Sequence, residues 1–385
     1  MARKLKKTVV DKQPTRKGVS KTATRSAAST KVTGRTAKSK VAGAAANAAQ
    51  SGGPVTLAEA RKIALAQGPQ TVAGAIPTPA EVAATHKSVA QARQNLKDLV
   101  KAENERRIRE YATTIQVMKN RGVRSAAATV GGGATAAVFQ PLQILAEGDS
   151  WFDYPVPFFG GGIIPRLQSL LGVPILSLAK AGEEVRNMLG VDERKIIIEQ
   201  LRNGSPAGGS WDALLFSGGG NDVVGNPLVI WIKDFNAAIP PADLIEKPRF
   251  DAVLEMVRAG YEDLIKLRDN LSPATQLIFH GYDFVIPDGR GVCGFGPCMK
   301  PSFDLRGYPP AAAGLVVKAM LQEFAAILQS LVASHSNVTF INTQGTLAPV
   351  RSSWHNELHP SKDGFTRITA VFQTKLRALF PGRVI

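Results

Sequence analysis

The residues best suited to chemistry in this chain are a serine, an asparagine and a histidine in three separate segments. Ser150 stands in the turn Gly148-Asp149-Ser150-Trp151, after an apolar run of strand length. Asn221 follows three consecutive glycines, and His359 lies in the C-terminal part of the sequence. A serine becomes a nucleophile where a base takes its proton, and amide donors stabilise the oxyanion that then develops. These residue types therefore suit acyl transfer, although a Gly-Asp-Ser turn alone indicates only the end of a strand.

A scaffold that could bring these residues together is visible from about residue 141 onward. Short apolar segments alternate there with longer segments of helical period. The predicted strands are 142–147, 174–179, 212–217, 275–280 and 338–342, and the predicted helices are 163–171, 191–203, 250–271, 310–335 and 361–379. This alternation predicts an α/β fold with a parallel sheet covered by helices on both faces.

Four segments follow strands or precede the last helix, and all are expected at the carboxyl edge of the sheet, where such folds bind ligands. They are residues 148–151, 179–183, 218–222 and 354–360. Gly148 can take a backbone conformation that other residues avoid, and Gly182 allows its N–H to approach a ligand closely. Two long inserts after the third and fourth strands, 225–249 and 283–309, are predicted to be lid or specificity loops.

In their order along the chain, these four blocks resemble those of the SGNH, or GDSL-type, hydrolases over roughly residues 141–385. The serine block and Gly219-Gly220-Asn221-Asp222 are the specific matches, and the Gly182 block is weaker. The resemblance implies a three-layer, flavodoxin-like α/β/α sandwich and ester hydrolysis without a metal or other cofactor. It also implies that Ser150 is the nucleophile and His359 the general base. The oxyanion hole would be formed by Gly182, Asn221 and the backbone N–H of Ser150.

One position departs from the family pattern. The family places an aspartate three residues before the histidine, whereas this chain has Asn356. An asparagine oxygen can accept a hydrogen bond from the imidazole but supplies no negative charge. The alternatives are Glu357 and a Ser–His dyad in which a backbone carbonyl holds the imidazole. We favour Asn356 or the dyad over Glu357.

Other interpretations of the same residues fail on spacing. Phe152 occupies the position where an α/β-hydrolase nucleophile elbow needs its second glycine. His355 and His359 are four residues apart, as in a zinc-binding helix, but Pro360 disfavours a helix that continues. We therefore predict no metal site.

Aromatic residues near the serine and near the fourth strand are candidates for the substrate pocket. Such side chains can pack against an acyl chain or a sugar face, and the sequence does not distinguish the two. The predicted lining residues are Trp151, Tyr154, His280 and Tyr282.

The first 140 residues lie outside the resemblance. Residues 1–50 hold 13 Lys or Arg and one acidic residue, which accounts for +12 of the formal net charge of +16. With few large apolar residues, the segment 1–56 is predicted to be a disordered basic tail. It would bind a polyanion, such as nucleic acid or an anionic surface, or act as a spacer.

A helical segment is predicted over 57–122, followed by a linker over 123–140. Its main part, the helix 79–122, starts with Pro79 and runs without a glycine or proline to Gly122. The spacing of its apolar residues indicates that it packs on the body or on a partner copy, which would make a homo-oligomer.

Location and redox state are predicted from what the sequence lacks. No apolar segment of signal-peptide type follows the basic start, and no run of 18 apolar residues indicates a membrane span. The default expectation is a cytoplasmic protein. Cys293 and Cys298 are then expected as reduced thiols, with a local disulfide as the alternative.

The predicted function is carboxylic ester hydrolysis through an acyl-enzyme, as in esterases, lipases and carbohydrate deacetylases. One alternative is a catalytically weakened binding protein of the same fold that acts through its basic tail. The other is a thioesterase or phospholipase of this fold.

Overall fold

The computed structural model describes residues 79–120, 140–154, 161–206, 208–291 and 296–384. The basic tail, residues 57–78, the linker before residue 140 and Cys293 lie outside these ranges, so the expectations for them stay predictions. All of the described residues belong to one compact unit that spans Pro54–Ile385.

A five-stranded, fully parallel sheet forms the centre of the fold, in the order β2-β1-β3-β4-β5. The strands are β1 (Ile144–Gly148), β2 (Ile175–Ser177), β3 (Ala213–Ser217), β4 (Gln276–His280) and β5 (Val338–Ile341). This is the flavodoxin-like strand order. Every residue of β1 and β3 is buried, because helices cover both faces, and this explains why the strands appear as continuous apolar runs. The predicted α/β fold and all five strands are confirmed.

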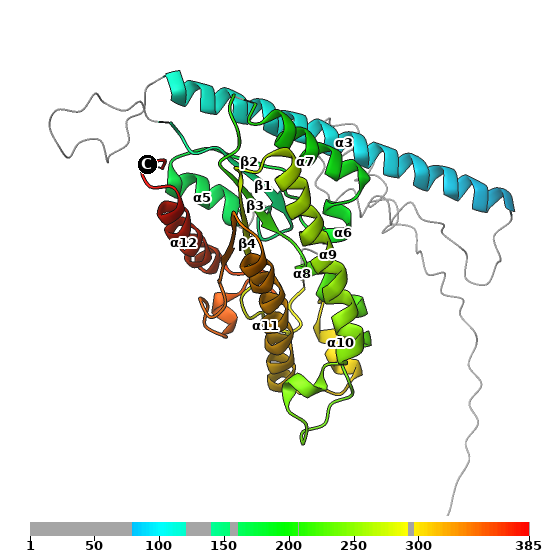
Figure 1. Cartoon of the computed structure of the whole chain (residues 1–385). Coiled ribbons are helices and arrows are strands. Elements are labelled where there is room, and N and C mark those ends of the chain that lie inside the picture. The colour runs from blue at the N-terminus through cyan, green and yellow to red at the C-terminus, as the bar shows by residue number, and fades with distance from the viewer. Residues whose placement is uncertain (1–78, 121–139, 155–160, 207, 292–295, 385) are drawn as a thin grey trace, which may run out of the picture. The chain divides into compact units, whose positions relative to one another are not determined.

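Helices cover the sheet in two layers, which completes the predicted three-layer sandwich (Figure 1). On one face of the sheet, α5 (Ile163–Leu171) packs against α12 (Lys362–Leu379). On the other face, α9 (Lys247–Leu271) contacts both α7 (Val191–Asn203) and α11 (Pro310–Ser334). Local signals set their ends. The side chain of Ser361 caps α12 by accepting from the N–H of Gly364 at 3.1 Å, and Gly172 ends α5 in the left-handed conformation.

The two long inserts contain short elements that sequence periodicity does not reveal. The first holds the 3₁₀ turns η2 (Asn226–Ile230) and η3 (Pro241–Leu244), and the second holds α10 (Lys300–Leu305). Further short elements are α6 (Val185–Met188), α8 (Gly220–Val223) and the 3₁₀ turn η4 (Arg351–Ser353). Each is five residues or fewer except α10, which has six.

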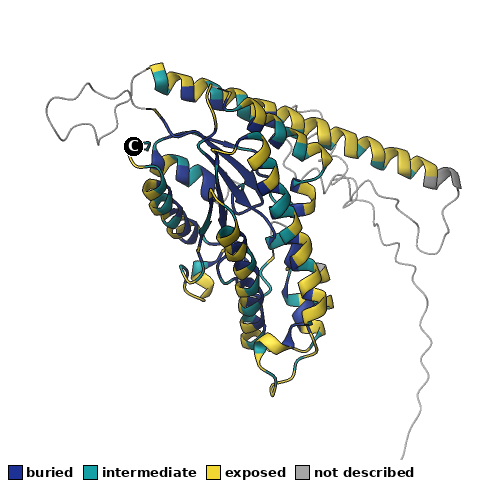
Figure 2. Ribbon diagram, in the orientation of Figure 1, coloured by how far each residue is buried: buried dark blue, intermediate teal, exposed yellow. Residues whose placement is uncertain are grey.

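Helix α3 (Pro79–Asn120) packs on the α/β domain with the C-terminal half of its length, and Lys97 in its first half forms a 2.7 Å ion pair with Asp192. Tyr111 and Ile115 are buried in the core, and the Tyr111 ring lies 5.3 Å from that of Trp211. Arg107 donates to the carbonyls of Ser177 and Ala179, at 3.2 and 3.0 Å. Most of the preceding half of α3 is exposed (Figure 2). The sequence predicted that this helix packs on the α/β domain or on a partner copy. The structure shows contacts with the α/β domain.

Among the helices that the structure describes, α11 alone is long and apolar enough to cross a membrane. It carries a buried face that includes Val316, Leu321 and Leu328, and it packs against β4, β5 and α9. A core helix of an α/β domain can have this length and composition, so the length and composition of α11 are only weak evidence for a membrane span.

Candidate active site

Ser150 lies in a turn that the end of β1 holds against β3. The N–H of Asp149 donates to the carbonyl of Ser217 at 3.0 Å, and the N–H groups of Phe152 and Asp153 close the turn onto the carbonyl of Asp149. Gly148 belongs to β1 and has no positive φ, so it does not use the conformational freedom of a glycine. The glycine is needed because an added Cβ would lie 2.7 Å from the Cβ of Ser217.

The imidazole of His359 contacts the serine directly. Its Nε2 lies 2.6 Å from the Oγ of Ser150, and its Nδ1 lies 3.0 Å from the Oδ1 of Asn356. Burial, together with the smaller effect of the neighbouring His355, lowers the pKa of His359 to about 3. The imidazole is therefore neutral near pH 7. In the tautomer that fits both contacts, Nδ1–H donates to Asn356 and Nε2 accepts from the Ser150 hydroxyl.

Asn356 is held in place by several donors. Its Oδ1 also accepts from the backbone N–H groups of Leu358 and His359, at 3.0 and 2.9 Å. On its other side, Nδ2 donates to the hydroxyl of Tyr154 at 3.0 Å. Of the three alternatives for the partner of the imidazole, the geometry thus favours Asn356.

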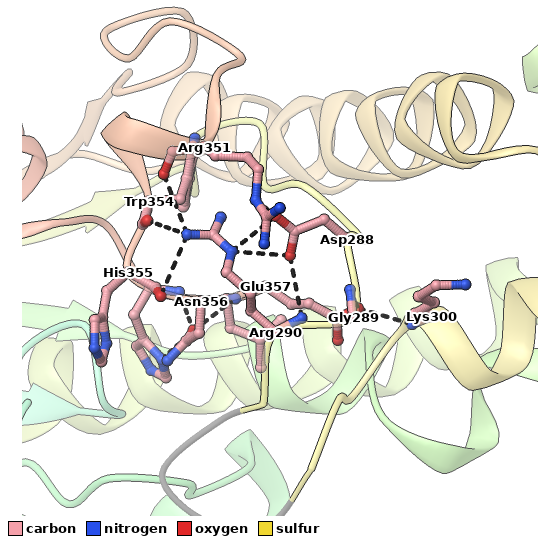
Figure 3. A network of polar contacts seen from close by, with 11 residues as sticks. Asp288, Gly289, Arg290, Lys300, Arg351, Trp354, His355, Asn356 and Glu357 are labelled. Atoms are coloured by element: carbon pink, nitrogen blue, oxygen red, sulfur yellow. Dashed lines mark hydrogen bonds and ion pairs between the residues drawn. The ribbon is translucent and has the colours of Figure 1, made fainter.

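Glu357 faces away from the imidazole, although it follows Asn356 in the sequence. Its fully buried carboxylate accepts from four backbone N–H groups of the insert 283–309, and Figure 3 labels two of the donors, Gly289 and Lys300. The donors and their distances are Gly289 at 2.9 Å, Cys298 at 2.6 Å, Met299 at 2.8 Å and Lys300 at 3.0 Å. With its lone pairs used in this way, Glu357 is excluded as the group that orients His359.

Arg290 fastens the same insert to the histidine loop from the other direction. Its guanidinium donates to the carbonyls of Arg351, Trp354 and His355 and forms a 2.8 Å ion pair with Asp288 (Figure 3). Sequence reasoning missed this network. The insert has no periodic pattern, and the partners of Glu357 are backbone groups, which leave no mark in the sequence.

A buried polar network lies beneath the serine turn. The carboxylate of Asp149 accepts from the N–H of Trp151 at 2.9 Å, from the hydroxyl of Ser217 at 2.9 Å and from the hydroxyl of Tyr282. Burial raises the pKa of Asp149 to about 6, against the effect of these donors. His280 Nε2 lies 2.8 Å from the Ser217 hydroxyl, and burial lowers the pKa of His280 to about 4.

Hydrogen bonds join the loop that carries Gly182 to the segment that carries Asn221. Gly182 has a φ of +83°, a conformation that favours glycine. Asn221 donates one amide hydrogen to the carbonyl of Glu183 at 2.7 Å, which leaves its second amide hydrogen for another acceptor. The carboxylate of Asp222 accepts from the N–H of Val185 at 3.0 Å and joins the same two segments.

A small cavity of about 30 Å³ lies beside the serine. Ser150 and Asn221 both line it, together with Asp149, Trp151, Gly220, Val224, Tyr282, Val285, Leu321 and Leu358. A larger cavity of about 640 Å³ lies along α3, α5 and β2, and its lining includes Phe152 and Asp153 but not Ser150.

The four aromatic candidates for the pocket have different positions. Trp151 and Tyr282 line the cavity, and the indole N–H of Trp151 also donates to the carbonyl of Leu358 at 3.1 Å. Neither His280 nor Tyr154 lines this cavity. His280 is buried beneath the turn, and Tyr154 is buried against the imidazole of His359, with ring centroids 4.3 Å apart. The direction of a side chain in a turn or at a strand end cannot be read from its residue type.

Comparison with known proteins gives similarity in structure alone: no family model and no curated protein matches the sequence. The chain resembles solved lipases and esterases. A lipase from a goat rumen metagenome has 20% identity and a TM-score of 0.40, covering 63% of this chain and 99% of its own. An extracellular lipase from Streptomyces rimosus has 15% identity and a TM-score of 0.39, with coverages of 60% and 99%.

A family 3 carbohydrate esterase from Clostridium thermocellum has 17% identity and a TM-score of 0.37, with coverages of 62% and 99%. Several other matches are described as SGNH hydrolases or as GDSL-type proteins.

Within the described ranges, no three His, Cys, Asp or Glu side chains are grouped so that they could hold a metal ion. His355, four residues before His359, places its Nδ1 2.7 Å from the hydroxyl of Tyr154.

Proposed function

We propose that this protein is a serine carboxylic ester hydrolase that works through an acyl-enzyme. The observation that carries the proposal is the 2.6 Å contact between the Oγ of Ser150 and the Nε2 of a neutral, buried His359. A nucleophile, a base and a group that orients the base, in hydrogen-bonded sequence, are the requirements of this chemistry.

In the acylation step, Ser150 attacks the ester carbonyl carbon while Nε2 of His359 takes the hydroxyl proton. The carbonyl oxygen becomes an oxyanion and accepts from the N–H groups of Ser150 and Gly182 and from the second amide hydrogen of Asn221. The imidazolium then gives its proton to the leaving alkoxide as the carbon–oxygen bond breaks. In deacylation, His359 takes a proton from water as the water oxygen attacks the acyl carbon. The imidazolium then returns this proton to the Oγ of Ser150 as the ester bond to the serine breaks and the acid leaves.

The size of the cavity supports a short acyl group. A space of about 30 Å³ holds only one or two water molecules, so an acetyl group fits it better than a long chain does. Its apolar walls, Val224, Val285 and Leu321, come from the end of α8, from the second insert and from α11. We therefore propose acetyl and similar short esters as the substrates.

The experiment that tests this function is hydrolysis of p-nitrophenyl acetate by the wild type and by Ser150→Ala. The expected result is turnover that disappears in Ser150→Ala and persists in Ser330→Ala, an exposed serine on α11 that serves as the matched control. Hydrolysis that is equal in all three proteins would overturn the proposal.

Thioesters and phospholipids require the same serine chemistry and belong in the same substrate panel. Binding of a polyanion by residues 1–50 and self-association through α3 stay predictions. Ordered contacts among Ser150, His359 and Asn356 favour an enzyme over a binding protein that has lost its site.

A further inference from the structure

Asn356 is one link of a chain of hydrogen bonds that extends from the imidazole to the surface. Its Oδ1 lies 3.0 Å from Nδ1 of His359, and its Nδ2 donates to the hydroxyl of Tyr154 at 3.0 Å. That hydroxyl lies 2.7 Å from Nδ1 of His355, which is exposed. The chain brings together residues 154 and 355–359, from the two loops that carry the serine and the base.

The direction of the bonds at Asn356 follows from its amide. Its Oδ1 accepts from Nδ1–H of His359, and its Nδ2–H donates to the Tyr154 hydroxyl. His359 and the Asn356 amide therefore donate in succession toward Tyr154, whose hydroxyl lies 2.7 Å from Nδ1 of His355. An amide that donates through its nitrogen carries more negative charge on its oxygen, and aligned bonds of this kind strengthen one another.

The ring of Tyr154 makes a second contact with the base. It stacks on the imidazole of His359 with centroids 4.3 Å apart and an angle of 28° between the planes. The face of an aromatic ring attracts a cation, and this attraction grows where water is excluded. Tyr154 is 1% exposed and His359 is 3% exposed, so the contact is almost dry.

We propose that Tyr154 is a positioning residue that compensates for the missing carboxylate at position 356. Its hydroxyl strengthens Asn356 as the acceptor for the imidazolium that forms when Ser150 loses its proton, and its ring stabilises the same cation. Nδ1 of His355, in hydrogen-bond contact with the hydroxyl, completes the chain. This inference rests on the proposed function, and it explains how an asparagine can serve where the SGNH pattern has an aspartate.

The test is a mutant cycle on the full-length chain with p-nitrophenyl acetate, measuring kcat and KM separately. The variants are Tyr154→Phe, Asn356→Asp and the double variant. Tyr308→Phe is the matched control, because Tyr308 is also a buried residue and its hydroxyl donates to the carbonyl of Lys233 at 2.8 Å. Ser150→Ala sets the background rate of the assay.

Tyr154→Phe is expected to lower kcat on the order of tenfold, part of the 10²–10⁴-fold contribution of a general base, with little change in KM. Tyr308→Phe should stay within about twofold of the wild type, as expected for a change outside the site. Adding Asn356→Asp to Tyr154→Phe should restore kcat by about fivefold or more, because a carboxylate supplies the missing charge itself. A merely structural role for Tyr154 would not produce this rescue.

Two results would overturn the inference. One is a kcat for Tyr154→Phe as high as that of Tyr308→Phe, and the other is an Asn356→Asp effect that is the same with and without the Tyr154 hydroxyl. Failure of the proposed function would look different. In that case the wild type itself would show no turnover above Ser150→Ala.

Discussion

The carboxylate of Glu357 lies 2.8 Å from the backbone N–H of Met299, so the residue next to Asn356 holds the second insert and leaves His359 to the asparagine. The same insert contributes Val285 to the cavity beside Ser150. The wall of the proposed acyl pocket and the loop that carries the base are therefore joined by one buried side chain.

Replacing Glu357 with glutamine should destabilise the fold. The glutamine NH₂ would face backbone donors, and at least one of the four buried N–H groups would lose its acceptor. We expect a loss of about 2–4 kcal/mol in the free energy of unfolding, measured by urea titration. The exposed Glu105→Gln, whose partner Arg109 is 3.8 Å away, should change it by less than about 0.5 kcal/mol. A Glu357→Gln protein as stable as this control would contradict the role of Glu357 in holding the second insert.

Removing the amide of Asn221 should slow the reaction rather than weaken substrate binding. Loss of one oxyanion donor costs on the order of 10²–10³ in kcat, and Asn221→Ala should show this loss with a nearly unchanged KM. Steady-state kinetics with p-nitrophenyl acetate gives both values, and Asn95→Ala on the exposed surface of α3 is the control. A larger change in KM than in kcat would remove Asn221 from the oxyanion hole.

Widening the cavity should change the acyl preference. Leu321→Ala removes a wall of the space beside Ser150, and the ratio of hexanoate to acetate hydrolysis should rise on the order of tenfold, since each methylene in such a pocket is worth 10–200-fold. Leu328→Ala deletes an equally buried leucine of the same helix outside the lining. The two variants should be similarly destabilised, but only Leu321→Ala should shift the ratio. An equal shift in both would argue against this pocket.

The buried base should make stability depend on pH with a definite sign. The pKa of His359 is lowered to about 3 in the folded protein and returns to the usual 6.5 on unfolding. Between these values the unfolded chain binds the extra proton, so the free energy of unfolding falls as pH decreases through this window.

His359→Gln isolates this effect from the other buried groups, among them Asp149, whose raised pKa acts in the opposite direction. From pH 6 to pH 5, the wild type should lose up to about 1.4 kcal/mol more than the variant. Parallel urea-unfolding curves at both pH values would show that His359 is not a buried neutral base.

The scaffold could be predicted from the sequence because its signals are local. β1 and β3 are buried on both faces and form continuous apolar runs, and α5 and α7 begin and end at the predicted residues. The parallel order then placed Ser150 and Asn221 at one edge of the sheet, and both line the same cavity.

The remainder depends on contacts between distant segments. Glu357 binds backbone groups of an insert without a pattern, and Tyr154 turns toward His359 instead of the cavity because Asn356 and His355 bond its hydroxyl. Gly148 is required by the closeness of β3, which no local sequence feature reveals. Such interactions follow from the fold and could not be deduced before it.

The most direct test of the central claim is the site of covalent labelling by a fluorophosphonate. Wild-type protein treated with the probe should gain one adduct, and peptide mass spectrometry should place it on Ser150. His359→Ala should react at least about 10² times more slowly than the wild type, because the serine loses its base. Ser150→Ala should not react. An adduct on another residue, or equal labelling of Ser150→Ala, would contradict the account.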